Sequence, residues 1–122
     1  MNKIIIDAKE NSPYMMVDAE NYNLTIKGNS YMTNPSQFYH FLSGVMNNIK
    51  VPESKLFEIN ITMGYYNTSS IQIINIILKT LCSANEGKVK ISFFIDKEED
   101  ELLETAMSLA FNTNVQPIIE YY

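Results

Sequence analysis

A strand, a helix and a second strand follow one another over residues 55–95, and this segment constrains the fold most strongly. Residues 55–63 alternate between apolar and polar side chains, and the apolar ones are Phe57, Ile59, Ile61 and Met63. Residues 71–82 instead carry apolar side chains at helical spacing, and residues 89–95 return to alternation. This order predicts a right-handed crossover that connects two parallel strands at the architectural centre of the molecule.

Further elements are expected on both sides of this crossover. Short strands are expected at residues 2–6, 14–18 and 23–27, an amphipathic helix at residues 36–49, an acidic helix start at residues 96–101, and a last strand at residues 115–122. Pro117 lacks a donor for strand pairing, so this last strand is expected at a sheet edge. The sequence thus predicts one α/β domain over residues 1–122, with a mixed sheet of five to six strands and about three helices.

The helix over residues 71–82 carries more apolar surface than one core-facing stripe requires. Its natural core face consists of Ile74, Ile77, Leu78 and Leu81. Ile73 and Ile76 are left in excess of this face. Neighbouring elements could bury both of them, or a partner protein could cover them.

Charge and residue usage exclude several classes of protein. The formal net charge of −5 argues against binding to nucleic acid, which needs clustered Lys and Arg. The single cysteine, Cys82, is expected as a core thiol, and His40 has no second ligand for a metal site. We expect a cytoplasmic protein without a membrane span, because no apolar run approaches about 20 residues.

Motifs for catalysis and for cofactor binding are missing. The sequence has no glycine-rich phosphate loop, no HExxH, no CxxC and no spaced pair of nucleophile and base. The acidic residues 96–101 are most simply a helix start, because they lack the spacing and the glycine of a calcium-binding loop. We therefore expect a non-enzymatic binding or regulatory domain with no metal or other cofactor.

The turn Tyr66-Asn67-Thr68-Ser69-Ser70 lies between the first strand of the crossover and the apolar helix. Asn, Thr and Ser are common helix caps, so plain capping is one interpretation. A hydroxyl at a helix amino terminus could also carry a phosphate, which the helix dipole tolerates. A phosphate there would change binding more than stability, and both interpretations stay open on these residues alone.

Several motifs in order along nearly the whole chain resemble the SiaC family of bacterial regulatory phosphoproteins. The most specific is the Tyr66–Ser70 turn, and weaker ones are residues 11–13, 26–31, 38–39 and 96–100. The resemblance implies a fold similar to the STAS anti-sigma-factor antagonists. It also implies partner switching, in which the unphosphorylated protein activates a diguanylate cyclase and so promotes cyclic-di-GMP synthesis and biofilm formation.

The resemblance also implies roles for individual residues and partners. Thr68 would be the phosphoacceptor of a histidine-kinase-like Ser/Thr kinase, and a PP2C-type phosphatase would remove the phosphate. The expected partner-binding residues are those of the turn together with Ile73 from the apolar excess of the helix: Tyr66, Asn67, Thr68, Ser69, Ser70 and Ile73. The alternatives are an anti-sigma-factor antagonist with another partner, a constitutive scaffold in which Thr68 only caps the helix, and a small enzyme that uses surface carboxylates.

Overall fold

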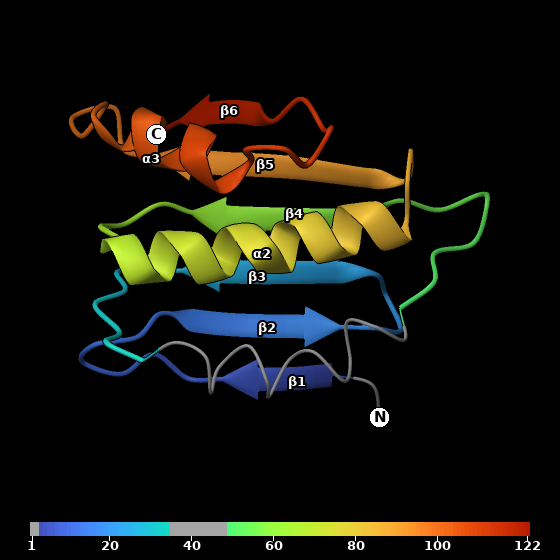
Figure 1. Ribbon diagram of the computed structural model, residues 1–122, viewed down its shortest axis with the longest axis horizontal. Coiled ribbons are helices and arrows are strands. Elements are labelled where there is room, and N and C mark those ends of the chain that lie inside the picture. The colour runs from blue at the N-terminus through green and yellow to red at the C-terminus, as the bar shows by residue number, and fades with distance from the viewer. Residues whose placement is uncertain (1–2, 35–48) are drawn as a thin grey trace.

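The computed structural model describes residues 3–34 and 49–122, which form a six-stranded sheet and two helices (Figure 1). The elements are β1 (Lys3–Ile6), β2 (Tyr14–Asp18), β3 (Asn23–Lys27), β4 (Phe57–Thr62), α2 (Thr68–Ala84), β5 (Val89–Ile95), α3 (Leu102–Leu109) and β6 (Ile118–Tyr121). The strands lie side by side in the order of the sequence. The predicted α/β class is confirmed, while the helix expected at residues 36–49 and His40 within it lie outside the described residues, apart from the buried Ile49.

The sheet changes from antiparallel to parallel at β3. Strands β1, β2 and β3 form an antiparallel meander, whereas β3–β4, β4–β5 and β5–β6 are parallel pairs. Helix α2 connects β4 to β5, as predicted for the crossover. The carboxyl ends of β3 and β4 therefore meet at one edge of the sheet, where α2 begins.

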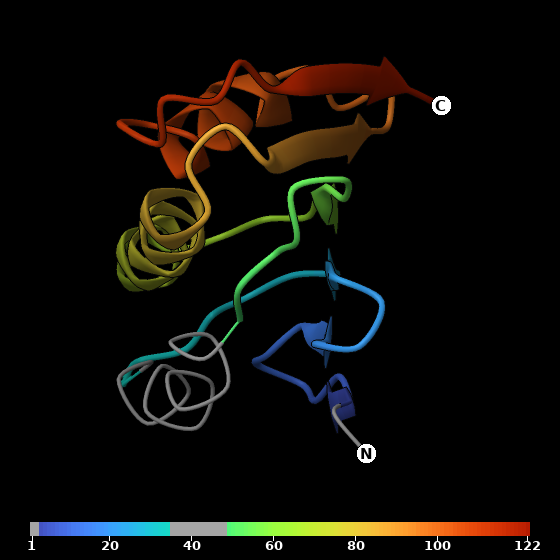
Figure 2. The same cartoon turned by 90° about the vertical axis from the view of Figure 1, so that its right-hand side faces the viewer.

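Both described helices cover the same face of the sheet, which Figure 2 shows edge-on. The alternating apolar residues of the central strands point to this face and are fully buried against α2. The predicted core face of α2 is confirmed, because Ile74, Ile77, Leu78 and Leu81 are all fully buried. Ile76 is 40% exposed and Ile73 is half-buried, so part of the apolar excess does reach the surface.

Cys82 near the end of α2 is a buried free thiol, as expected from the sequence. Burial raises the pKa of this thiol to about 11, because the charged thiolate is poorly solvated there. The thiolate is the reactive form of cysteine. Cys82 therefore contributes packing to the core.

The carboxyl-terminal elements begin later than expected. Residues 96–101 form turns ahead of α3 instead of its first helical turn, and α3 begins at Leu102. The Asp96 carboxylate accepts a hydrogen bond from the backbone N–H of Glu98 at 3.0 Å, a local bond that favours a turn over a helix. Strand β6 begins only after Pro117 and lies at the sheet edge, which confirms its predicted position.

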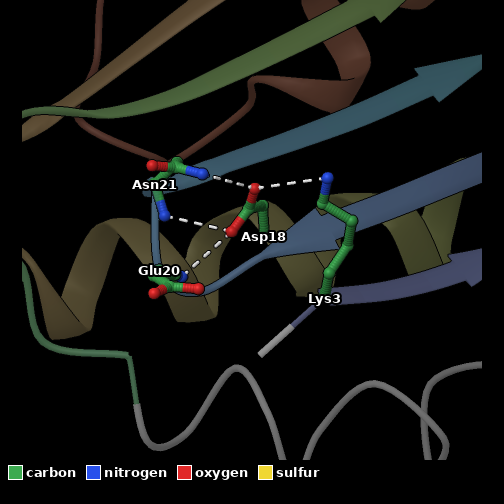
Figure 3. Close-up of polar contacts among 4 residues, drawn as sticks. All are labelled: Lys3, Asp18, Glu20 and Asn21. Atoms are coloured by element: carbon green, nitrogen blue, oxygen red, sulfur yellow. Dashed lines mark hydrogen bonds and ion pairs between the residues drawn. The ribbon is translucent and has the colours of Figure 1, made fainter. Parts of the chain in front are cut away.

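The turn between β2 and β3 is fixed by Asp18, whose side chain is only 6% exposed (Figure 3). Its carboxylate accepts hydrogen bonds from the backbone N–H groups of Glu20 and Asn21, both at 3.0 Å, and from the Asn21 side chain at 2.9 Å. Lys3 of β1 lies 3.8 Å away. The hydrogen bonds from Asn21 are the main reason why the pKa of Asp18 is lowered. These contacts hold the turn that leads into β3, and residues 28–31 follow the other end of that strand.

Candidate functional site

Two loops meet at the edge of the sheet where α2 begins. Residues 28–34 follow β3, and residues 63–67 connect β4 to α2. The backbone N–H of Ser30 donates to the carbonyl of Tyr65 at 2.8 Å, and the N–H of Asn67 donates to the carbonyl of Ser30 at 3.1 Å. These bonds form a parallel bridge between Ser30 and Tyr66, so the pairing of β3 with β4 continues into the two loops.

Gly64 lets the two loops approach each other. A Cβ atom at this position would lie 2.8 Å from the backbone carbonyl carbon and oxygen of Gly28 and would collide with the side chain of Asn29. Next to it, the side-chain oxygen of Asn29 accepts a hydrogen bond from the N–H of Tyr65 at 2.8 Å. Only glycine fits this contact without a shift of the backbone.

Asn67 is the amino-terminal cap of α2. Its side-chain oxygen accepts a hydrogen bond from the N–H of Ser70 at 3.0 Å, and its backbone carbonyl accepts one from Ile71 at 3.0 Å. Its side-chain amide also donates to the carbonyl of Met32 at 3.0 Å, which ties the cap to the loop after β3. The expectation that Thr68 caps the helix is therefore wrong, because Asn67 is the capping residue.

Ser70 and Tyr66 are buried, although both are among the expected partner-binding residues. The Ser70 hydroxyl forms a buried hydrogen bond of 2.6 Å with the hydroxyl of Ser30. The Tyr66 ring is 4% exposed and packs in the core, where burial raises the pKa of its phenol. Its hydroxyl has no hydrogen-bond partner among the described residues. Neither side chain is accessible to a partner, so each would affect binding only by holding the exposed residues next to it in place.

Thr68 has the opposite environment. It is the first residue of α2, its side chain is exposed, and its hydroxyl makes no hydrogen bond within residues 3–34 and 49–122. The next residue, Ser69, is half-buried. Of the three consecutive hydroxyl-bearing residues, Thr68 is thus the only one classed as exposed.

Two exposed tyrosines, Tyr31 and Tyr65, stack beside this site. Their ring centroids are 5.2 Å apart and their planes differ by 25°. They are 42% and 54% exposed, respectively. Sequence reasoning placed Tyr65 in the functional stretch but did not pair it with Tyr31, because the two lie in separate loops and meet only when β3 neighbours β4. The sequence signal that could have indicated this contact is a tyrosine shortly after the end of each of the two strands.

Replacing Asn67 with alanine should lower the free energy of unfolding by about 0.5–2 kcal/mol, the usual cost of losing a helix cap. The substitution also removes the bond to Met32. Urea unfolding followed by circular dichroism measures the effect. Asn67→Asp is the matched control, because it keeps the capping oxygen, loses the amide donor to Met32 and adds a negative charge that the helix dipole favours. An unchanged midpoint in Asn67→Ala would contradict the assigned cap.

A membrane-spanning helix and a cluster of metal-ligating side chains are both absent from the described residues. No described helix is long and apolar enough to cross a bilayer. Within residues 3–34 and 49–122, no group of three or more His, Cys, Asp or Glu side chains is placed to hold a metal ion.

Comparisons with known proteins found one matching family and similar solved structures. The model of the SiaC family regulatory phosphoproteins matches residues 6–119. No curated protein matches the sequence. Among solved structures, SiaC of Pseudomonas aeruginosa is similar with a TM-score of 0.78 and 21% identity, over 100% of both chains. A chain of the Pseudomonas aeruginosa complex of diguanylate cyclase SiaD with its activator SiaC gives the same score and identity, over 98% of this chain and 99% of that one.

Proposed function

Because the chain belongs to the SiaC family of regulatory phosphoproteins, we propose that it is a partner-switching protein in which Thr68 accepts the phosphate. In its unphosphorylated form it binds and activates a diguanylate cyclase, and phosphorylation of Thr68 ends this contact. The main support for the proposal is that Thr68 is exposed at the start of α2, whereas Ser70, two residues later, is buried and hydrogen-bonded.

The local geometry supports Thr68 over its neighbours as the acceptor. A kinase must place the acceptor hydroxyl in line with the γ-phosphate of ATP, which requires a side chain that it can reach. Ser70 is fully buried and bonded to Ser30, so its use would require the first turn of α2 to open. Ser69 is half-buried and is the second choice.

The fold can carry a phosphate at this position. The cap interactions belong to Asn67, so modification of Thr68 removes none of the described hydrogen bonds. The first turn of α2 contains no acidic residue, so the positive end of the helix dipole has no carboxylate beside it there. A phosphate of about −1.5 to −2 charges should therefore leave the domain folded.

A solved complex of a similar protein supports the diguanylate cyclase as the partner. The SiaC of Pseudomonas aeruginosa is described as the activator of the diguanylate cyclase SiaD, and its chain has the fold seen here. The proposal extends this partner to the present chain. A histidine-kinase-like Ser/Thr kinase would add the phosphate and a PP2C-type phosphatase would remove it, while the chain itself does no chemistry.

Incubation with ATP and the cognate kinase should add about 80 Da to the wild-type protein, the mass of one phosphoryl group. The Thr68→Ala variant should gain no mass, and Ser69→Ala and Ser70→Ala should still be labelled. Intact-mass spectrometry makes the measurement. Labelling that persists in Thr68→Ala and disappears in Ser69→Ala would move the acceptor to Ser69. A labelled protein that binds a partner other than a cyclase would favour the anti-sigma-factor antagonist instead.

A further inference from the structure

Charged residues make up 19% of the chain, but three long stretches contain no Asp, Glu, Lys or Arg: residues 28–49, 59–78 and 105–119. Two of these contribute to the site, through residues 28–34 and residues 59–78. The first includes the loop after β3, and the second runs from β4 through most of α2. Buried strands and helices often lack charge, so only the exposed members of these stretches carry information about binding.

The structure places exposed members of both stretches around Thr68. The Ser30–Tyr66 bridge and the bond from Asn67 to Met32 hold the two loops together. Residues four positions apart in a helix lie on nearly the same side of it. Thr68, Gln72 and Ile76 therefore form a row about 12 Å long on the surface of α2. We use the term uncharged face for the exposed residues of this surface, which are Tyr31, Tyr65, Thr68, Gln72 and Ile76.

Among the described residues, charged groups lie along the borders of the uncharged face. Lys79 is the first charged residue after it on α2, and Lys9 and Glu10 line a groove next to Tyr31. The segment that follows β5 at the same sheet edge is mainly acidic, with only Lys97 among its acidic residues. Neither loop of the site and no residue in the first turns of α2 supplies a cation for a phosphate on Thr68.

We propose that the uncharged face docks on an equally uncharged surface of the diguanylate cyclase, and that phosphorylation acts by placing an unneutralised charge in that contact. This inference rests on the proposed function and adds its mechanism. The cores of protein interfaces are depleted in charge and enriched in tyrosine, as this face is. Burying a charge without a partner opposes association whichever sign the charge has.

The test places charges of both signs on the uncharged face without touching Thr68. Gln72 is exposed one helical turn after Thr68, so Gln72→Glu and Gln72→Lys each add one charge there. Ser83 is exposed on the same helix beyond Lys79, and Ser83→Glu and Ser83→Lys are the matched controls. Binding to a purified diguanylate cyclase from the source organism is measured by calorimetry, and circular dichroism verifies the fold of each variant.

Both Gln72 variants should raise the dissociation constant about tenfold or more, and both Ser83 variants should leave it unchanged. Wild-type binding should also change little between about 0.1 and 0.5 M NaCl, because few charges are paired across the contact. Tighter binding of Gln72→Lys together with weaker binding of Gln72→Glu would overturn the proposal, because it would reveal an acidic partner surface. Unchanged binding of both would show that the cyclase docks elsewhere.

These outcomes are separable from a failure of the proposed function. If phosphorylated wild type loses binding while the Gln72 variants keep it, the phosphate switch stands and only the uncharged contact is overturned. If unphosphorylated wild type does not bind the cyclase at all, both proposals fall.

Discussion

Replacing Gly64 with alanine should destabilise the domain by about 1–3 kcal/mol, the usual cost of overpacking. The added methyl group would lie 2.8 Å from the backbone carbon and oxygen of Gly28, and backbone atoms cannot rotate aside as a flexible side chain can. Relief requires the loops after β3 and β4 to separate, which strains the bonds between Ser30 and residues 65–67. Thermal or urea unfolding measures the loss.

Gly87→Ala is the matched control for this prediction. Gly87 has a φ of +77°, and an added Cβ would meet no atom within 4 Å. Its substitution therefore costs backbone strain of about 1–2 kcal/mol without crowding the site. Gly64→Ala should also separate Tyr31 from Tyr65 and so weaken partner binding, whereas Gly87→Ala should leave binding intact. Equal binding by both variants would contradict the role given to the contact of the two loops.

Most of the fold could be predicted from the period of the hydrophobic pattern. Strands β2, β3 and β5 were expected at their observed bounds, because alternation ends abruptly at Asn, Asp or Gly turns. Helix α2 begins at Thr68, three residues earlier than its apolar pattern, because a capped first turn needs no apolar side chain. The acidic residues 96–101 misled the prediction of α3, since a carboxylate favours a local turn as readily as a helix start.

The candidate site was predicted only in part. The turn Tyr66–Ser70 stood out because it lies between an alternating strand and an apolar helix, and the resemblance to the SiaC family singled out Thr68 within it. The sequence could not show that Asn67 takes the cap, that Ser70 is bonded to Ser30 across 40 positions of the chain, or that Tyr31 stacks on Tyr65. Each of these contacts depends on β3 pairing with β4, and the chain between these two strands is 29 residues long (28–56). Strand order is not encoded in any local pattern.

Phosphorylation of Thr68 should weaken binding to the diguanylate cyclase about 100-fold, which corresponds to about 2.8 kcal/mol. The expected loss arises because a phosphate of about −1.5 to −2 charges would be buried against a surface where the loops of the site offer no cation. The fold should survive, since the cap and the Ser30–Ser70 bond do not involve Thr68. Thr68→Val should bind like the unphosphorylated protein and resist the kinase, because valine has a similar shape without the hydroxyl.

The most direct test titrates the cyclase with fully phosphorylated protein, with unphosphorylated protein and with protein treated with the phosphatase, while cyclic-di-GMP synthesis is recorded. The unphosphorylated and phosphatase-treated forms should bind and activate the cyclase equally. The phosphorylated form should bind about 100-fold more weakly and give little activation at the same concentration, while its unfolding temperature stays within a few degrees. Equal activation by all three forms would contradict a switch at Thr68.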